Sequence, residues 1–247
     1  MSLSESVTLF ATCIGDLVTP ETVEDAERAL QVCGCNPTPA TGTTCCGQPA
    51  FNAGFHRQAR AVARVTARAL SKTRGPIVVP AGSCAAMMYR HWPELFAGDR
   101  DEQLVRAVAR RVVEFTAVLA AHCDELRAAN LHLSRRVGYH DSCHMLRELG
   151  LSAEPRAVLG CIDGLELVPL SSAERCCGFG GTFAVRYPEV SVAMADSKLD
   201  DVVAEGIDML VSADSGCIMQ LGSRAARAYA GLRVVHIATV LREAGLR

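Results

Sequence analysis

Residues 44–49 read Thr-Cys-Cys-Gly-Gln-Pro, and residues 175–180 read Arg-Cys-Cys-Gly-Phe-Gly. Each copy of this Cys-Cys-Gly motif has one further cysteine on either side. The upstream cysteine precedes the pair by 32 positions in the first copy and 33 in the second, and the downstream one follows the pair by 38 and 40. Such constant spacing indicates an internal duplication, with one four-cysteine site in each half. The eight cysteines are Cys13, Cys45, Cys46 and Cys84, then Cys143, Cys176, Cys177 and Cys217.

The composition is typical of a globular protein and gives no sign of binding to nucleic acid or to a membrane. The chain has 247 residues, of which 49% are hydrophobic and 21% charged, as in an ordinary globular protein. A formal net charge of −2 gives no signature of binding to nucleic acid or to a membrane surface. No apolar run approaches the roughly 18 residues that a membrane span needs. The first residues lack the basic start and long apolar core of a signal peptide, so we expect a cytoplasmic protein without a membrane span or a nucleic-acid partner.

Hydrophobic patterning predicts an α/β fold. Short apolar runs predict buried strands, and longer periodic stretches predict helices between them. We expect two pseudo-symmetric cysteine-rich halves, each a small, mainly parallel sheet with flanking helices. Periodicity is lost near residues 128–136, which divides the chain into 1–130 and 131–247. The expected strands are 7–13, 77–80, 137–140, 165–169, 209–212 and 234–237, and the expected helices include 20–33, 51–72, 101–122 and 188–204, with a loop at 36–44 and a turn at 81–83.

The eight repeated cysteines are expected to bind metal. Without an export signal, the chain is expected in a reducing compartment, where structural disulfides are rare. Four thiolates per half match the ligand number of a [4Fe–4S] cluster and also of a structural zinc ion. Adjacent cysteines can bind different irons of one cluster but hardly one tetrahedral ion. We therefore expect one or two iron–sulfur clusters per chain, with zinc in one site as the alternative.

Other residues have less specific roles. Four cysteines have no counterpart at the repeated spacing and are expected to be small buried hydrophobic residues. His140 and His144 flank Cys143, where they could orient a cluster or could be ordinary structural histidines. A basic stripe on the expected helix 51–72 is either a solvated face or a docking surface for an acidic partner. The four other cysteines are Cys33, Cys35, Cys123 and Cys161, and the basic stripe comprises Arg57, Arg60, Arg64, Arg68 and Lys72.

With these motifs, the chain resembles the lactate utilization protein A family, which is built on a duplicated cysteine-rich CCG domain. The resemblance covers nearly the whole length. Similar domains occur in the iron–sulfur subunit of glycolate oxidase and in one of the subunits of heterodisulfide reductase. The most specific stretches are 45–54 (Cys-Cys-Gly-Gln-Pro-Ala-Phe-Asn-Ala-Gly), 80–84 (Pro-Ala-Gly-Ser-Cys), 176–183 (Cys-Cys-Gly-Phe-Gly-Gly-Thr-Phe), 214–219 (Asp-Ser-Gly-Cys-Ile-Met) and 235–238 (Val-His-Ile-Ala).

The resemblance implies an iron–sulfur electron-transfer subunit in the oxidation of L-lactate to pyruvate. It implies two partner proteins, one of them a ferredoxin-like iron–sulfur protein, so the chain would be an oxidoreductase subunit that needs partners for turnover. An iron–sulfur subunit for glycolate or another 2-hydroxy acid, and a non-catalytic metal-stabilised redox sensor or interaction protein, are the alternatives.

The chain departs from the reductase pattern at one position in each half. In heterodisulfide reductase the motif ends Cys-x-x-Cys, whereas residues 84–87 here read Cys-Ala-Ala-Met and residues 217–220 read Cys-Ile-Met-Gln. A fifth thiolate is therefore missing from both halves, which favours an ordinary cubane cluster over an opened one.

Overall fold

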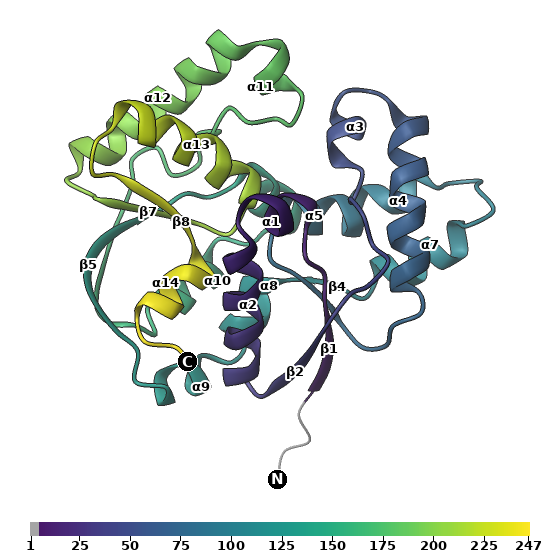
Figure 1. Cartoon of the computed structure of the whole chain (residues 1–247), viewed down its shortest axis with the longest axis horizontal. Coiled ribbons are helices and arrows are strands. Elements are labelled where there is room, and N and C mark those ends of the chain that lie inside the picture. The colour runs from purple at the N-terminus through teal and green to yellow at the C-terminus, as the bar shows by residue number, and fades with distance from the viewer. Residues whose placement is uncertain (1–4) are drawn as a thin grey trace.

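The computed structural model describes residues 5–247, which form an α/β fold with two four-stranded parallel sheets (Figure 1). The strand order of the first sheet is β2-β1-β3-β4, and that of the second is β6-β5-β7-β8, so the same topology occurs twice. Every strand pair is parallel. The expected fold class is confirmed. The strands are β1 (Glu5–Leu9), β2 (Cys35–Pro39), β3 (Ile77–Val79), β4 (Val112–Glu114), β5 (His132–Tyr139), β6 (Asp163–Val168), β7 (Met209–Ser212) and β8 (Arg233–His236).

Helices flank both sheets. Two of the helical turns are π-helical, and each begins shortly after a cysteine of one of the two groups, Cys84 or Cys143. No helix within residues 5–247 is both long enough and apolar enough to cross a membrane. The helices are α1 (Cys13–Val18), α2 (Pro20–Val32), α3 (Gln48–Asn52), α4 (His56–Leu70), α5 (Gly82–Ala86), η1 (Met87–His91), α6 (Trp92–Leu95), α7 (Glu102–Ala109), α8 (Phe115–Ala120), α9 (Cys123–Ala128), η2 (Met145–Leu149), α10 (Ala153–Leu159), α11 (Phe183–Arg186), α12 (Pro188–Ala204), α13 (Ser215–Ala228) and α14 (Ile237–Glu243).

The long helix expected over 101–122 is wrong. The chain leaves α7 after Ala109, forms β4 and then starts α8. The apolar residues of β4 fit a helical period, but tertiary pairing decides their conformation. Val112 lies opposite Ile77 and Glu114 lies opposite Val79 in the parallel ladder with β3. Glu114 then caps α8 by accepting hydrogen bonds from the amides of Thr116 and Ala117.

Four further expectations in the first half are wrong. The expected loop at 36–44 begins as β2, an edge strand, where Pro37 and Pro39 are tolerated because one side of the strand forms no ladder. The expected helix 51–72 is two helices, α3 and α4, separated at Gly54 with φ 81°. The expected turn at 81–83 already contains the start of α5. The first strand also ends at Leu9 and does not reach Cys13.

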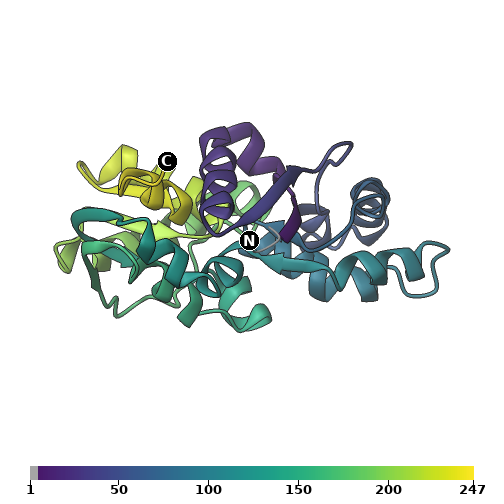
Figure 2. The same ribbon diagram turned by 90° about the horizontal axis from the view of Figure 1, so that it is seen from below.

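The two halves share one apolar core. Leu30 of α2 and Phe115 of α8 belong to the same buried cluster as Val158 of α10 and Leu241 of α14. Figure 2 shows the two sheets side by side, with α2 between them. The boundary between residues 130 and 131 stays a prediction, and it falls in the connection between α9 and β5.

Glu114 should make stability depend on pH. Burial raises the pKa of its carboxyl from 4.5 to about 7, and among the described residues Oε1 has no hydrogen-bond partner. Between these two pH values the folded state binds more protons than the unfolded state, so the free energy of unfolding falls as the pH rises. The full effect is about 3 kcal/mol. Glu114→Gln should flatten this fall in urea unfolding measured from pH 4 to 8, and an unchanged slope would contradict the assignment.

Candidate metal centres

The first four-cysteine group lies beyond the carboxyl ends of the first sheet. Cys13 is the first residue of α1, Cys45 and Cys46 follow β2, and Cys84 lies in α5. The sulfurs of Cys13 and Cys45 are 3.5 Å apart, and those of Cys46 and Cys84 are 3.4 Å apart. The two pairs are joined because the thiol of Cys46 is also hydrogen-bonded to Cys45. Segments that are distant in sequence therefore meet at one place.

The second group repeats this arrangement at the second sheet. The sulfurs of Cys177 and Cys217 are 3.1 Å apart. Cys176 is hydrogen-bonded to the thiols of both Cys143 and Cys177. All eight cysteines named from the sequence thus lie in two groups of four, and their role as metal ligands stays a prediction.

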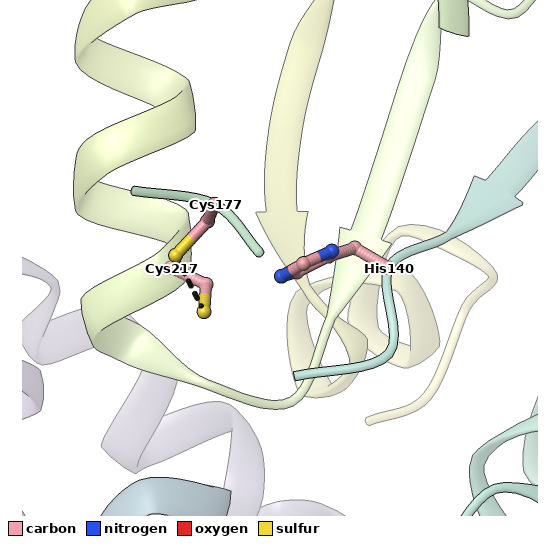
Figure 3. Close-up of side chains that lie close together, drawn as sticks. All are labelled: His140, Cys177 and Cys217. Atoms are coloured by element: carbon pink, nitrogen blue, oxygen red, sulfur yellow. Dashed lines mark hydrogen bonds between the residues drawn. The ribbon is translucent and has the colours of Figure 1, made fainter. Parts of the chain in front are cut away.

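A histidine adds a nitrogen to the second group. A ring nitrogen of His140 lies within 4.8 Å of the sulfurs of Cys177 and Cys217, and Figure 3 shows the imidazole directed toward them. Neither ring nitrogen has a hydrogen-bond partner among the described residues. Burial, followed by the charge of Lys198, lowers the pKa of His140 to about 3. The side chain is therefore a neutral imidazole, the form that binds metals. His144 lies beside Cys143, with 3.5 Å between Nδ1 and Sγ.

The glycine after each cysteine pair has a steric and an electrostatic role. The amide of Gly47 donates to Cys45 Sγ and that of Gly178 donates to Cys176 Sγ, both at 3.4 Å. Their φ angles are 88° and 84°, in the left-handed region that favours glycine. A Cβ would stand 2.8 Å from the carbonyl oxygen of Ala59 at the first position and 2.6 Å from that of Ser191 at the second. The motif thus brings the backbone close to a helix and directs one amide at sulfur.

One cysteine of each site is favoured as a thiolate. Hydrogen bonds from the Cys13 and Cys46 thiols, together with that of the Gly47 amide, lower the pKa of Cys45 to about 3. The equivalent bonds from Cys143 and Cys177 lower the pKa of Cys176 to about 2. The same thiol hydrogen bonds raise the pKa of the donors. A bound cation would instead favour the thiolate form of every ligand.

Asp214 connects the two sites. It lies before α13, is buried, and accepts a hydrogen bond from the amide of Cys217 at 3.1 Å through Oδ1. Its other oxygen, Oδ2, accepts from the amide of Ser83, next to Cys84, at 2.7 Å. The amide of Gly82 also donates to the carbonyl of Ala213 at 3.1 Å. These bonds fasten the segment of one downstream cysteine to that of the other. The motif Asp-Ser-Gly-Cys by itself carries no sign of this bridge.

Buried side chains hold the cysteine-pair loops. The Trp92 indole donates to the carbonyl of Cys46 at 2.9 Å, and the Thr66 hydroxyl donates to that of Cys45 at 3.0 Å. In the second half, the buried Lys198 ammonium donates to the carbonyls of Ser172 and Ala173, which precede the cysteine pair. Burial lowers the pKa of Lys198 to about 8.

The basic stripe of α4 is largely engaged within the chain. Arg60 donates to the carbonyl of Leu95 at 2.7 Å. Arg64 pairs with Asp99 and Asp101 at 2.6 and 2.7 Å, and Arg68 pairs with Asp101. For Arg60, Arg64 and Arg68 the structure therefore favours an intramolecular role over a docking surface for an acidic partner.

The donor chemistry of the two groups fits a thiolate-bound metal. In a tetrahedral zinc site with bonds of about 2.3 Å, ligand sulfurs lie about 3.8 Å apart. The sulfur pairs measured here are 3.1 to 3.5 Å apart. Ligands on different irons of a cluster lie farther apart still. Binding of a zinc ion or of an iron–sulfur cluster would therefore need the cysteine side chains to rotate outward. The convergence of four sulfurs at one place already fits both kinds of metal site.

In comparison with known proteins, the two halves of the chain match the same family separately. Residues 7–89 and residues 137–222 each match the family described as "Cysteine-rich domain". "Lactate utilization protein A" of Exiguobacterium sp. is 38% identical over 240 residues, covering 96% of this chain and 97% of the relative. The protein of the same name from Geobacillus kaustophilus is 39% identical over 238 residues, covering 95% and 98%. This chain belongs to the lactate utilization protein A family. In this member of the family, the two matched regions contain both cysteine groups, which supports binding of a metal cluster.

Proposed function

We propose that the chain is an iron–sulfur electron-transfer subunit of a complex that oxidises L-lactate to pyruvate. The observation that carries the proposal is the pair of equivalent sites, each with four converging sulfurs, at the carboxyl ends of two parallel sheets. The names of the full-length relatives support the assignment to lactate.

Each site would hold one [4Fe–4S] cluster, which supplies one-electron transfer when bound. The chain's own residues would bind and orient it. Cys13, Cys45, Cys46 and Cys84 would hold the first, and their counterparts Cys143, Cys176, Cys177 and Cys217 the second. The amides of Gly47 and Gly178 each donate to a ligand sulfur, and such bonds raise the reduction potential. His140 is present only at the second site, so the two sites should differ in potential.

In the part of the chain that the structure describes, a pocket beside the first group offers no cationic side chain for the carboxylate of lactate. It is lined by Cys13, Cys46 and Cys84, with Phe179 and Gly216 from the second half. Among the described residues that line it, none is an arginine, lysine or histidine that would bind a carboxylate. In line with the family resemblance, we propose that turnover needs two lactate-utilization partner proteins, one of them a ferredoxin-like iron–sulfur protein.

The test is metal analysis of anaerobically purified protein. Wild type should contain about eight irons per chain, two clusters of four, and an EPR signal after reduction. Cys46→Ser and Cys177→Ser should each lose about half of the iron. A colourless zinc protein would contradict the cluster, and about four irons that are lost only in Cys177→Ser would contradict the two-site form.

The partners need a separate experiment. Affinity purification from cells grown on lactate should recover the ferredoxin-like protein and a second partner, and lactate oxidation should require all three. Oxidation of lactate by the purified chain alone would overturn the electron-transfer role. Oxidation of glycolate but not lactate by the assembled complex would change the substrate.

A further inference from the structure

A second set of cysteines meets at the opposite end of the molecule. Cys33 follows α2 and Cys35 begins β2, whereas Cys123 begins α9 and Cys161 precedes β6. These positions lie toward the amino ends of the strands, away from both four-cysteine sites. In Figure 1, α9 lies at the lower edge, far from α1, α5 and α13. The sequence predicts these residues as small buried hydrophobic residues, and the structure shows that they are neighbours.

Within this set, the side chains of Cys123 and Cys161 are hydrogen-bonded to each other. The sulfur of Cys161 lies 3.3 Å from the carbonyl oxygen of Ala157 and 3.7 Å from that of Cys123. The sulfur of Cys123 lies 3.8 Å from the same Ala157 oxygen. Both thiols therefore share one acceptor, the carbonyl oxygen of Ala157.

Thiol–disulfide exchange uses one thiol that an external disulfide can reach and a second thiol that attacks the mixed disulfide, and the two cysteines differ in this respect. Cys123 is half-buried and reachable from solvent, whereas Cys161 is buried at 5% exposure. Burial, followed by a hydrogen bond to Cys123, raises the pKa of Cys161 to about 11. Cys123 is thus the side chain that an external reagent meets first, and Cys161 stands behind it as a resolving thiol.

We propose that Cys123 and Cys161 form a reversible disulfide when they meet a small-molecule disulfide such as oxidised glutathione. The Cys123 thiolate attacks one glutathione sulfur, forms a mixed disulfide and releases one glutathione thiolate. Cys161 loses its proton to solvent and attacks the Cys123 sulfur, which releases the second glutathione. The two cysteines lose two electrons and two protons in total, and the oxidised glutathione takes up both electrons.

This bond would fasten the junction of the two halves. Cys123 lies in the connection that leads out of the first sheet, and Cys161 leads into β6 of the second. Cys33 and Cys161 belong to the core cluster that both halves share, and Cys123 packs against it. Because the pair is remote from the metal-site cysteines, its oxidation should leave metal content unchanged.

Tryptic digestion gives a direct readout. Peptide 112–127 contains Cys123 as its one cysteine, and peptide 157–175 likewise contains only Cys161. Full-length, metal-loaded protein is equilibrated without oxygen in glutathione buffers from reducing to oxidising, blocked with iodoacetamide, digested and analysed by mass spectrometry. In the oxidising buffers we expect these two peptides to be cross-linked, with the mass of both less two hydrogens, and to separate on reduction.

Two variants decide the roles of the pair. In Cys161→Ser the cross-link should be absent and peptide 112–127 should carry glutathione, whereas Cys35→Ser should keep the cross-link. Alkylation of Cys123 by iodoacetamide even in the most oxidising buffer would overturn the proposal. So would a cross-link from 112–127 to peptide 29–57, which contains Cys33, Cys35, Cys45 and Cys46.

Discussion

Gly178→Ala is expected to disrupt the second cysteine site and to lower the free energy of unfolding by about 3 kcal/mol or more. Two effects add at this position. The left-handed backbone, with φ 84°, costs an L-residue about 1–2 kcal/mol. A Cβ would also stand 2.6 Å from the carbonyl oxygen of Ser191, so the loop or α12 has to move. That movement displaces Cys176 and Cys177, and the metal content of the second site should be lost.

Gly231→Ala is the matched control. Gly231 has nearly the same φ, 87°, but nothing lies within 4 Å of its Cβ position. It should show only the backbone cost of about 1–2 kcal/mol, with normal metal content. Urea unfolding and iron analysis of both variants under anaerobic conditions separate the two effects. Equal losses of stability and full iron in both would contradict the role assigned to the close approach at Gly178.

Asp214→Ala is expected to weaken both sites at once. It removes the acceptor of the Cys217 amide and of the Ser83 amide, at 3.1 and 2.7 Å. Each donor left unpaired costs about 1–3 kcal/mol, so the total loss should be about 2–6 kcal/mol. Because the two amides adjoin Cys217 and Cys84, metal loading should fall in both halves.

The exposed pair of Asp208 with Arg135 provides a comparison. Both side chains are about half exposed, so Asp208→Ala should cost no more than about 1 kcal/mol. Asp214→Asn should fall between, since one amide oxygen can replace only one of the two acceptors. Loss of metal from the second half alone in Asp214→Ala would show that the bridge to Ser83 has no mechanical role.

The hydrogen bonds of Asp214 and the shared apolar core explain how the two halves of a duplicated sequence form one structure. Each half has the strand order of the other, yet α2 and α8 of the first half pack with α14 and α10 of the second in a shared core. Arg242 of α14 pairs with the buried Asp25 of α2 at 3.0 Å. A change in either half is therefore expected to affect the stability of both.

Much of the fold could be read from local patterns. Helix α12 and strand β7 have the predicted bounds. In both, the local pattern of apolar and flanking residues favours the same conformation as the packing in the folded chain. The segment 101–122 failed because a helical period and a short strand bury the same apolar residues, and pairing with β3 decides between them. The segment 36–44 failed because its prolines signal a loop unless the strand lies at a sheet edge.

By itself, the sequence determined the duplication, the α/β class and the eight cysteines that recur at constant spacing, because spacing and hydrophobic period are properties of the chain. Tertiary structure alone decided three things: His140 faces Cys177 and Cys217, Asp214 joins Ser83 to Cys217, and Cys123 meets Cys161. The physical reason is that these contacts join the ends of different strands and helices. Cys123 and Cys161 are 38 positions apart, and Ser83 and Asp214 are 131 apart, so they come together only when the sheets are formed and packed.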